Sequence, residues 1–385
     1  MGIYHTGKRP PLVVGESLLP AVIPLLRKLG IEAEVKSFSI HKPGATVCLS
    51  VTESITAPFL RADGRIPNYA YNTPRDLFDR AILNAAERAG ATIFPSAARL
   101  ETGDVPNTVR LSKETLDAAG GFFTDQPDFI VDASGRARVI ARLLDCKTTT
   151  GSRRDIALFA HLDSVRMNDA GNIHVDLLSR GWGWRIPLPG KASCGIVMDP
   201  KHLQTYGASA EAQYDGFLKN DPTLKIHCAD SRRITPVVRY NNYQLITETM
   251  YGAGWAMVGD AAGFTDPVFS SGLYLGMRGA FALAELIRDG STFRLQKYQS
   301  DRRRELKLWQ RVIDSWYDGR LFNLYRAGQA RKDGFLGARI AGRVERRLGR
   351  IFSGRATDDP HDLTIFEYLM ALGAVLRNPD DLAVV

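Results

Sequence analysis

The chain has 385 residues, of which 44% are hydrophobic and 24% charged, and its net charge is +8. This composition predicts a folded globular protein of two to three domain-sized units and excludes a disordered chain. No apolar run reaches the roughly 18 residues of a membrane-spanning helix, and neither a signal-peptide core nor a metal-ligand spacing of histidines is present. The basic excess is mild and spread out. We therefore expect a cytoplasmic protein without a metal centre, an integral membrane segment or a nucleic-acid partner.

The four cysteines stand at positions 48, 146, 194 and 228, and no two of them form a CxxC pair. Each lies in an apolar or strand-like stretch. This pattern predicts buried free thiols in a reducing compartment.

The first hundred residues alternate helix and strand signals. Apolar residues recur at helical spacing over 16–31, with Ser17 as a capping residue, Pro24 as an expected kink and Gly30 as the stop. The segments that follow predict a strand, an amphipathic helix and a strand, over 44–51, 73–90 and 91–100.

The segment 127–144 predicts a buried parallel strand, a tight turn of small residues and a helix. Residues 155–245 then carry short apolar segments separated by turn residues, which predicts an antiparallel sheet with polar insertions. The pattern of strand, acidic residue and small-residue turn returns at 254–263. A helix is expected over 272–290, and a mostly helical region from 291 to the end.

The strongest motif is VGDAAGFTDPVFSSGLYLGMRGA, at 258–280. Asp260 follows a strand at the carboxyl end, where α/β folds bind ligands, and a carboxylate there accepts sugar hydroxyls. Gly272 and the serines before it open a helix, whose free amides attract anions. The structural alternative is an acidic turn residue followed by an ordinary helix cap.

Two weaker motifs precede it. VDASGR, at 131–136, places Asp132 and Arg136 around a similar turn. GESLLP, at 15–20, places Gly15, Glu16 and Ser17 before a helix, where simple capping is the structural alternative.

The order of these motifs resembles the flavin-dependent halogenases and the related monooxygenases built like para-hydroxybenzoate hydroxylase. The resemblance covers nearly all of residues 12–290. The signature WxWxIP is met by Trp182, Trp184, Ile186 and Pro187, and the pattern FxxPxxSxG by Phe264, Pro267, Ser270 and Gly272.

The resemblance implies that reduced FAD and O2 oxidise a halide to hypohalous acid. Ser271 and Gly272 match the halide-binding amides, and an anion at a helix start is what the local dipole favours. Lys42, in the stretch KPGA, matches the lysine that carries the oxidant to the substrate, either by hydrogen bonding or as a chloramine. A desolvated lysine with a depressed pKa suits both roles. The structural alternative is a solvated lysine beside a turn.

The resemblance also implies the residues that contact FAD. These cofactor-binding residues would be Gly15, Glu16, Ser17, Arg75, Asp132, Arg136, Asp260, Pro267 and Gly272. A separate reductase would supply the reduced flavin, because the sequence shows no nicotinamide site.

The implied fold class is α/β. An FAD/NAD(P)-binding domain over 1–37, 67–150 and 245–290 would carry an antiparallel β substrate domain over 38–66 and 151–244. A C-terminal helical region would take 291–385. No GxGxxG occurs in the 385 residues, so we expect the first βαβ unit to be missing and FAD to bind poorly at best. A lost start, a natural truncation and supply of the unit by another chain remain open.

Phe269 stands where tryptophan-type members carry a glutamate. This difference favours a small electron-rich aromatic substrate such as a pyrrole or phenol, in some members tethered to an acidic carrier protein. Four arginines near one helical face over 338–350 are a candidate docking site for such a carrier, although a solvated face is the simpler interpretation.

The stretch GWGWRIPLPG, at 181–190, places Trp182 and Trp184 on one face of a strand, with Pro187 expected to interrupt the strand. Together with Phe269 they would form a wall between flavin and substrate. A plain aromatic core stripe is the structural alternative. For the whole chain, a monooxygenase of the same fold and an inactive flavoprotein acting as a binding module remain alternative functions.

Overall fold

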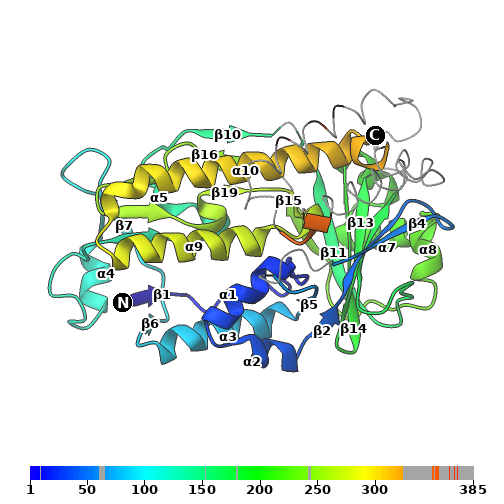
Figure 1. Ribbon diagram of the computed structural model, residues 1–385, viewed down its shortest axis with the longest axis horizontal. Coiled ribbons are helices and arrows are strands. Elements are labelled where there is room, and N and C mark those ends of the chain that lie inside the picture. Colours follow the sequence, from blue (N-terminus) through cyan, green and yellow to red (C-terminus); the bar gives the residue numbers. More distant parts are fainter. Residues whose placement is uncertain are drawn as a thin grey trace, which may run out of the picture.

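The computed structural model describes residues 1–8, 10–59, 66–151, 153–178, 181–241 and 244–323, together with 349, 350, 352–354, 364, 368 and 371. A large sheet lies at one end of the molecule, and two long helices run from it toward small sheets at the other end (Figure 1). These helices are α9 (Gly272–Arg288) and α10 (Leu295–Tyr317). The architecture is the α/β one predicted, with an antiparallel sheet inserted into it.

The large sheet has seven strands and comes from the two segments assigned to a substrate domain. Every neighbouring pair is antiparallel except β12 and β3, which run parallel. In spatial order the strands are β15 (Val238–Asn241), β11 (Ile156–Leu162), β14 (Lys191–Met198), β13 (Trp182–Leu188), β12 (Ile173–Leu177), β3 (Gly44–Cys48) and β4 (Ser54–Pro58).

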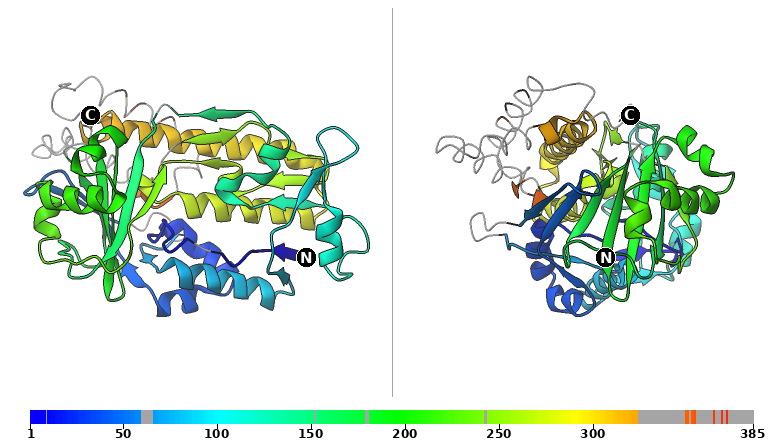
Figure 2. Two further views of the ribbon diagram at one scale, coloured as in Figure 1. Left: turned by 180° about the vertical axis from the view of Figure 1, so that it is seen from behind. Right: turned by 90° about the vertical axis from the view of Figure 1, so that its right-hand side faces the viewer.

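Short helices on one side of this sheet were missed by the sequence analysis. α7 begins after Ser209, whose hydroxyl accepts a hydrogen bond from the Ala212 amide, and it packs Tyr214 and Phe217 against the sheet. Figure 2 shows these helices against the strands. Their apolar positions are too few to distinguish them from strands by periodicity. They are α6 (Pro200–Leu203), α7 (Ala210–Asn220) and α8 (Leu224–His227).

A fully buried ion pair holds the centre of the sheet. Arg185 in β13 binds both oxygens of Asp176 in β12, at 2.8 and 2.7 Å, and neither side chain is exposed. Its remaining nitrogen donates to the carbonyl of Arg166 at 2.6 Å, and Nη2 also lies 3.4 Å from the sulfur of Cys48 in β3. A buried charge is tolerated only with such partners. The pair therefore ties three strands together.

The other half of the molecule contains short parallel strands. β1 (Gly2–Tyr4) pairs with β6 (Thr92–Phe94), and β9 (Ile130–Asp132) pairs with β18 (Trp255–Met257). Among the described residues, β1 and β9 each pair with one neighbouring strand and have a second edge without a strand partner. β9 is parallel as predicted, but the expectation that it is buried is only partly correct, because Val131 is 41% exposed.

The remaining elements connect these parts. The helices are α1 (Ile23–Lys28), α2 (Glu32–Ser37), α3 (Arg75–Arg88), α4 (Lys113–Ala118) and α5 (Val139–Leu143). The strands are β2 (Ile40–Lys42), β5 (Ala70–Asn72), β7 (Leu100–Thr102), β8 (Val109–Leu111), β10 (Thr148–Thr150), β16 (Leu245–Thr247), β17 (Tyr251–Gly252) and β19 (Gly263–Phe264).

The helix predicted over 16–31 is shorter than expected. Ser17 bridges to Asn72 and caps no helix, because the chain is still extended there. A 3-10 turn over 20–22 leads into α1, and Pro24 lies in the first turn of that helix, where its missing N–H costs nothing. The predicted kink at Pro24 is therefore wrong. Gly30 adopts the left-handed conformation just after the helix, as a stop requires.

Strand β13 places Trp182, Trp184 and Ile186 on the same face, within one hydrophobic cluster, as predicted. The two indole centroids are 5.7 Å apart. Pro187 does not interrupt the strand, which continues to Leu188. Pairing with β12 has already ended at Arg185, so the proline lies beyond that ladder.

Trp184 requires a glycine opposite it. A Cβ on Gly195, its partner in β14, would lie 2.2 Å from the Trp184 ring. We expect Gly195→Ala to lower the free energy of unfolding by about 1–3 kcal/mol, through overpacking of the core. Trp184→Phe removes the clashing ring atoms. In denaturant unfolding, the double variant should therefore lose less unfolding free energy than the two single variants lose in sum. Simple additivity would contradict the clash.

Candidate functional site

Two arginines, Arg75 and Arg136, lie near the carboxylate of Asp260, and Arg75 also borders Gly15. Arg75, at the start of α3, donates to the carbonyl of Val14 and pairs with Asp79 at 3.0 Å. Burial raises the pKa of Asp260, while Arg136 and Arg75 both act to lower it. The three side chains therefore lie within electrostatic reach of one another, although they come from distant segments.

Gly15 has a φ of +100° and Gly259 a φ of +59°, and both conformations favour glycine. A Cβ on Gly15 would also lie 2.9 Å from Arg75. A carboxylate that accepts sugar hydroxyls beside two guanidinium groups suits a nucleotide with phosphates. The donor set on this side of the molecule thus fits a flavin dinucleotide.

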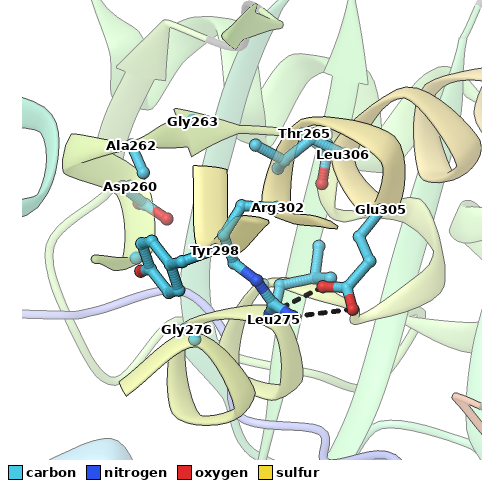
Figure 3. A pocket seen from close by; sticks show the side chains of 13 residues that line it. Asp260, Ala262, Gly263, Thr265, Leu275, Gly276, Tyr298, Arg302, Glu305 and Leu306 are labelled. Carbon is cyan, nitrogen blue, oxygen red and sulfur yellow. Dashed lines mark hydrogen bonds and ion pairs between the residues drawn. The ribbon is translucent and has the colours of Figure 1, made fainter. Parts of the chain in front are cut away.

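A small pocket adjoins Asp260, between α9 and α10 (Figure 3). Arg302 crosses it and pairs with Glu305 at 2.6 Å, and Arg278 reaches the same carboxylate at 2.9 Å. Of the glycines of α9 that line this pocket, Gly279 faces Arg302 and Tyr298, whereas Gly276 faces Gly259. Burial raises the pKa of Glu305, and the two arginines oppose that shift. This cluster was not found from the sequence, because its members are ordinary charged residues at helical spacing.

The VDASGR turn is stabilised by its own aspartate. Asp132 is buried, and its two oxygens accept hydrogen bonds from the amides of Ser134, at 2.9 Å, and Ile140, at 2.8 Å. Arg136 donates to the carbonyl of Asn241 and lies over the ring of Phe264 at 5.1 Å. The contacts of Asp132 and Arg136 with a cofactor stay predictions.

Glu16 lies buried against a histidine of the large sheet. Its Oε1 is 2.8 Å from Nε2 of His161 in β11, and both side chains are about nine-tenths or more buried. The neighbouring hydroxyl of Ser17 is buried without a hydrogen-bond partner. The contact of these residues with a cofactor stays a prediction. His161 carries no local motif, so sequence reasoning missed it.

Lys42 is fully buried at the end of β2. Its Nζ donates to the carbonyl of Leu18 at 2.9 Å and lies 5.2 Å from the centroid of the Phe59 ring. Among the described residues no carboxylate pairs with this amine, and burial lowers the pKa of Lys42 from 10.5 to about 7. The expected desolvated lysine is therefore present, and the solvated alternative is excluded.

The turn before α9 has the form that the FxxPxxSxG pattern suggests. Asp266 caps a short 3-10 turn by accepting from the amide of Val268 at 2.9 Å, and Ser270 follows with a φ of +57°. Ser271 is fully buried, whereas Gly272 is exposed and a Cβ there would meet nothing within 4 Å. Open space therefore adjoins the first amides of the helix. Of the two serines considered as caps, Ser271 takes the capping position, although its side chain makes no capping hydrogen bond.

The aromatic residues predicted to form a wall share one buried cluster. Trp182, Trp184 and Phe269 lie in it together with Phe59, the ring beneath Lys42. The Phe269 ring also contacts Trp316 edge-on at 5.8 Å. The structure thus brings the lysine and the wall residues into one core.

No helix within the described residues is long and apolar enough to cross a membrane, and no group of three metal-ligating side chains was found among them. The four cysteines are free thiols. The arginine face predicted at 338–350 lies almost entirely outside the described residues.

The burial of Lys42 predicts a specific pH dependence of stability. The depressed pKa means that, between about pH 7 and pH 10, the unfolded chain holds a proton that the folded chain lacks. Stability therefore rises with pH in this window. From pH 7 to 9, the wild type should gain about 2 kcal/mol relative to Lys42→Met in denaturant unfolding. A pH-independent difference between the two proteins would contradict a depressed pKa.

The chain is similar in sequence to known halogenases. The chain is 28% identical over 292 residues to a tryptophan 2-halogenase of Chondromyces crocatus, a match that covers 72% of this chain and 54% of the relative. It is 23% identical over 343 residues to a 1H-pyrrole-2-carbonyl-[peptidyl-carrier protein] chlorinase of Pseudomonas fluorescens, which covers 79% and 75% of the two chains. The match thus spans only about half the length of the first of these relatives.

The fold is also similar to that of a solved flavin-dependent brominase. The TM-score is 0.78 at 20% identity, and the match covers 98% of this chain and 93% of the other. The family model described as tryptophan halogenase matches residues 46–320, more than half of the chain. This chain therefore belongs to the tryptophan halogenase family.

Proposed function

We propose that this chain is a flavin-dependent halogenase that acts on an electron-rich aromatic compound. The observation that carries the proposal is the buried Lys42, whose amine lies against Phe59 in the same cluster as the two tryptophans. Family membership supports the reaction type, and the motif residues are all present within the matched region or just before it.

FAD, when bound and reduced, supplies the two electrons that let O2 convert halide and a proton into hypohalous acid and water. Asp260 would accept ribityl hydroxyls, and Arg75 and Arg136 would balance the phosphates. The remaining residues expected at the cofactor are Gly15, Glu16, Ser17, Asp132, Pro267 and Gly272. A separate reductase would supply the reduced flavin.

The residues of the chain divide the chemistry between them. The amides of Ser271 and Gly272 would hold halide at the open start of α9, where the helix dipole favours an anion. Lys42 would then present the oxidant to the substrate. With a pKa of about 7, its ammonium form is available to hydrogen-bond hypohalous acid, and its amine form to react with it to give a chloramine and water.

The aromatic wall would separate the two chemical steps. Trp182, Trp184 and Phe269 are buried in one hydrophobic cluster, and a wall formed by them would exclude water and keep the substrate away from the flavin. Phe269 supplies no carboxylate, so the substrate must be reactive without a nearby base. A pyrrole or phenol meets that requirement, and the relative that chlorinates a carrier-bound pyrrole supports a carrier-tethered substrate.

The first experiment supplies reduced FAD, O2, and chloride or bromide with a set of pyrroles and phenols. We expect products whose mass and isotope pattern follow the halide. Lys42→Met should reduce halogenation by about 100-fold or more while oxidation of reduced flavin continues, since the lysine acts after the halide is oxidised. Lys36→Met, which changes an exposed lysine of α2, is the matched control. A hydroxylated product that forms without halide would instead identify a monooxygenase.

The second experiment tests cofactor binding. Asp260→Ala should weaken FAD binding by about 10- to 100-fold, because a charge-assisted hydrogen bond contributes about 1.5–3 kcal/mol. Asp289→Ala, at the far end of α9, serves as the control. Titration of flavin fluorescence measures both, and equal dissociation constants for the two variants would remove Asp260 from the cofactor site.

A further inference from the structure

The turn from Asp266 to Gly272 is anchored by a residue distant in the sequence. Tyr317, in the last turn of α10, donates its hydroxyl hydrogen to Oδ2 of Asp266 at 2.7 Å. The other oxygen of Asp266 accepts from the Val268 amide, so one carboxylate joins α10 to the turn. Both side chains of this bond are nine-tenths or more buried.

Trp182 completes the arrangement from the large sheet. Its Nε1–H donates to the oxygen of Tyr317 at 2.8 Å. The Tyr317 hydroxyl thus accepts a hydrogen bond from Trp182 and donates one to Asp266. These two bonds fix the direction of its O–H. The three residues form a buried chain of hydrogen bonds, Trp182–Tyr317–Asp266, that connects the sheet, α10 and the start of α9.

The charges around this chain keep the phenol in its neutral form. Burial raises the pKa of Tyr317 well above its ordinary value, and Asp266 and Asp155 raise it further. Arg153 lies 3.8 Å from the centroid of the Tyr317 ring and is itself held by Asp155 at 2.7 Å. The positive charge of Arg153 against the ring is therefore balanced by Asp155, and Tyr317 remains a hydrogen-bond donor.

The turn needs such an anchor because its backbone is unfavourable. Ser270 adopts a left-handed conformation, which is costly for a residue with a Cβ and persists only where the surroundings fix it. Within the described part of the chain, the hydroxyl of Ser271 makes one long contact, 3.4 Å from the hydroxyl of Thr265. The carboxylate of Asp266, with its bonds at 2.7 and 2.9 Å, thus ties down the segment that orients the amides of Ser271 and Gly272.

We propose that Trp182, Tyr317 and Asp266 are positioning residues that hold this turn in the conformation that binds halide. The inference rests on the proposed function and deepens it. It gives the first tryptophan of WxWxIP a role as a hydrogen-bond donor to Tyr317, which in turn holds the halide-binding turn, and this role is separate from any role as a wall. Trp184 lacks this role, since its Nε1 bonds Ser193 at 3.2 Å within the sheet.

The test compares Tyr317→Phe with Tyr214→Phe. Tyr214 is also fully buried and also donates its hydroxyl hydrogen, to the carbonyl of Cys194 at 2.9 Å, but it packs on the opposite side of the sheet. Both variants lose one buried hydroxyl. Only Tyr317→Phe should raise the KM for bromide, by about tenfold, with kcat changed by less than about threefold. Trp182→Phe should raise the same KM by a smaller factor, because the bond from Tyr317 to Asp266 is retained.

A second readout needs no activity. Hydrogen exchange of the peptide over 264–275 should be about tenfold faster in Tyr317→Phe than in wild type, and unchanged in Tyr214→Phe. Equal exchange and equal bromide KM in the two variants would overturn the inference. Faster exchange with an unchanged bromide KM would also overturn it, because the turn would then not govern halide binding. A wild-type protein that halogenates nothing would defeat the proposed function alone, and the exchange experiment would still decide whether the three residues hold the turn.

Discussion

The structure depends on the register of strand β13, which the buried pair of Arg185 and Asp176 fixes. Side chains alternate across a strand, so a slip by one residue would exchange the two faces. The guanidinium would then enter the aromatic cluster, and the indoles would turn toward α7 and α8. Removing one member of such a buried pair lowers the free energy of unfolding by about 3–5 kcal/mol, because the remaining charge is left buried without a partner or water to solvate it. An interaction on one side of the sheet therefore determines where Trp182 and Trp184 lie on the other.

From that register, the site assembles at the junction of the sheet with the long helices. The sheet supplies the tryptophans, β2 supplies Lys42, and the start of α9 supplies the open amides. α10 packs along α9 and also reaches the sheet through Tyr317 (Figure 1). These groups come from segments that are far apart in the sequence. One helix, α10, thus contacts both the turn before α9 and the strand that carries Trp182.

Local patterns predicted most of the elements and the motif residues. The alternation in GWGWRIP predicted a shared face for Trp182 and Trp184, whereas Lys42 was singled out through the family resemblance of the stretch KPGA. What the sequence did not show are pairings between residues with no pattern of their own: His161 with Glu16, and Arg278 of α9 with Glu305 of α10. Such contacts arise only when distant segments pack together. The short helices over 200–227 were missed for a different reason, since few apolar positions carry little periodicity.

The two halves of the molecule also differ in how cooperatively they are held. In the large sheet, β11, β13 and β14 have seven or eight residues and are paired on both edges. The parallel strands β1 and β9 have three residues each and, within the described residues, one ladder each. Short strands with solvated backbone groups open at a low free-energy cost. We therefore expect the half that carries Asp132 and Asp260 to open before the large sheet does, so that a ligand bound there would stabilise the protein mainly by closing that local equilibrium.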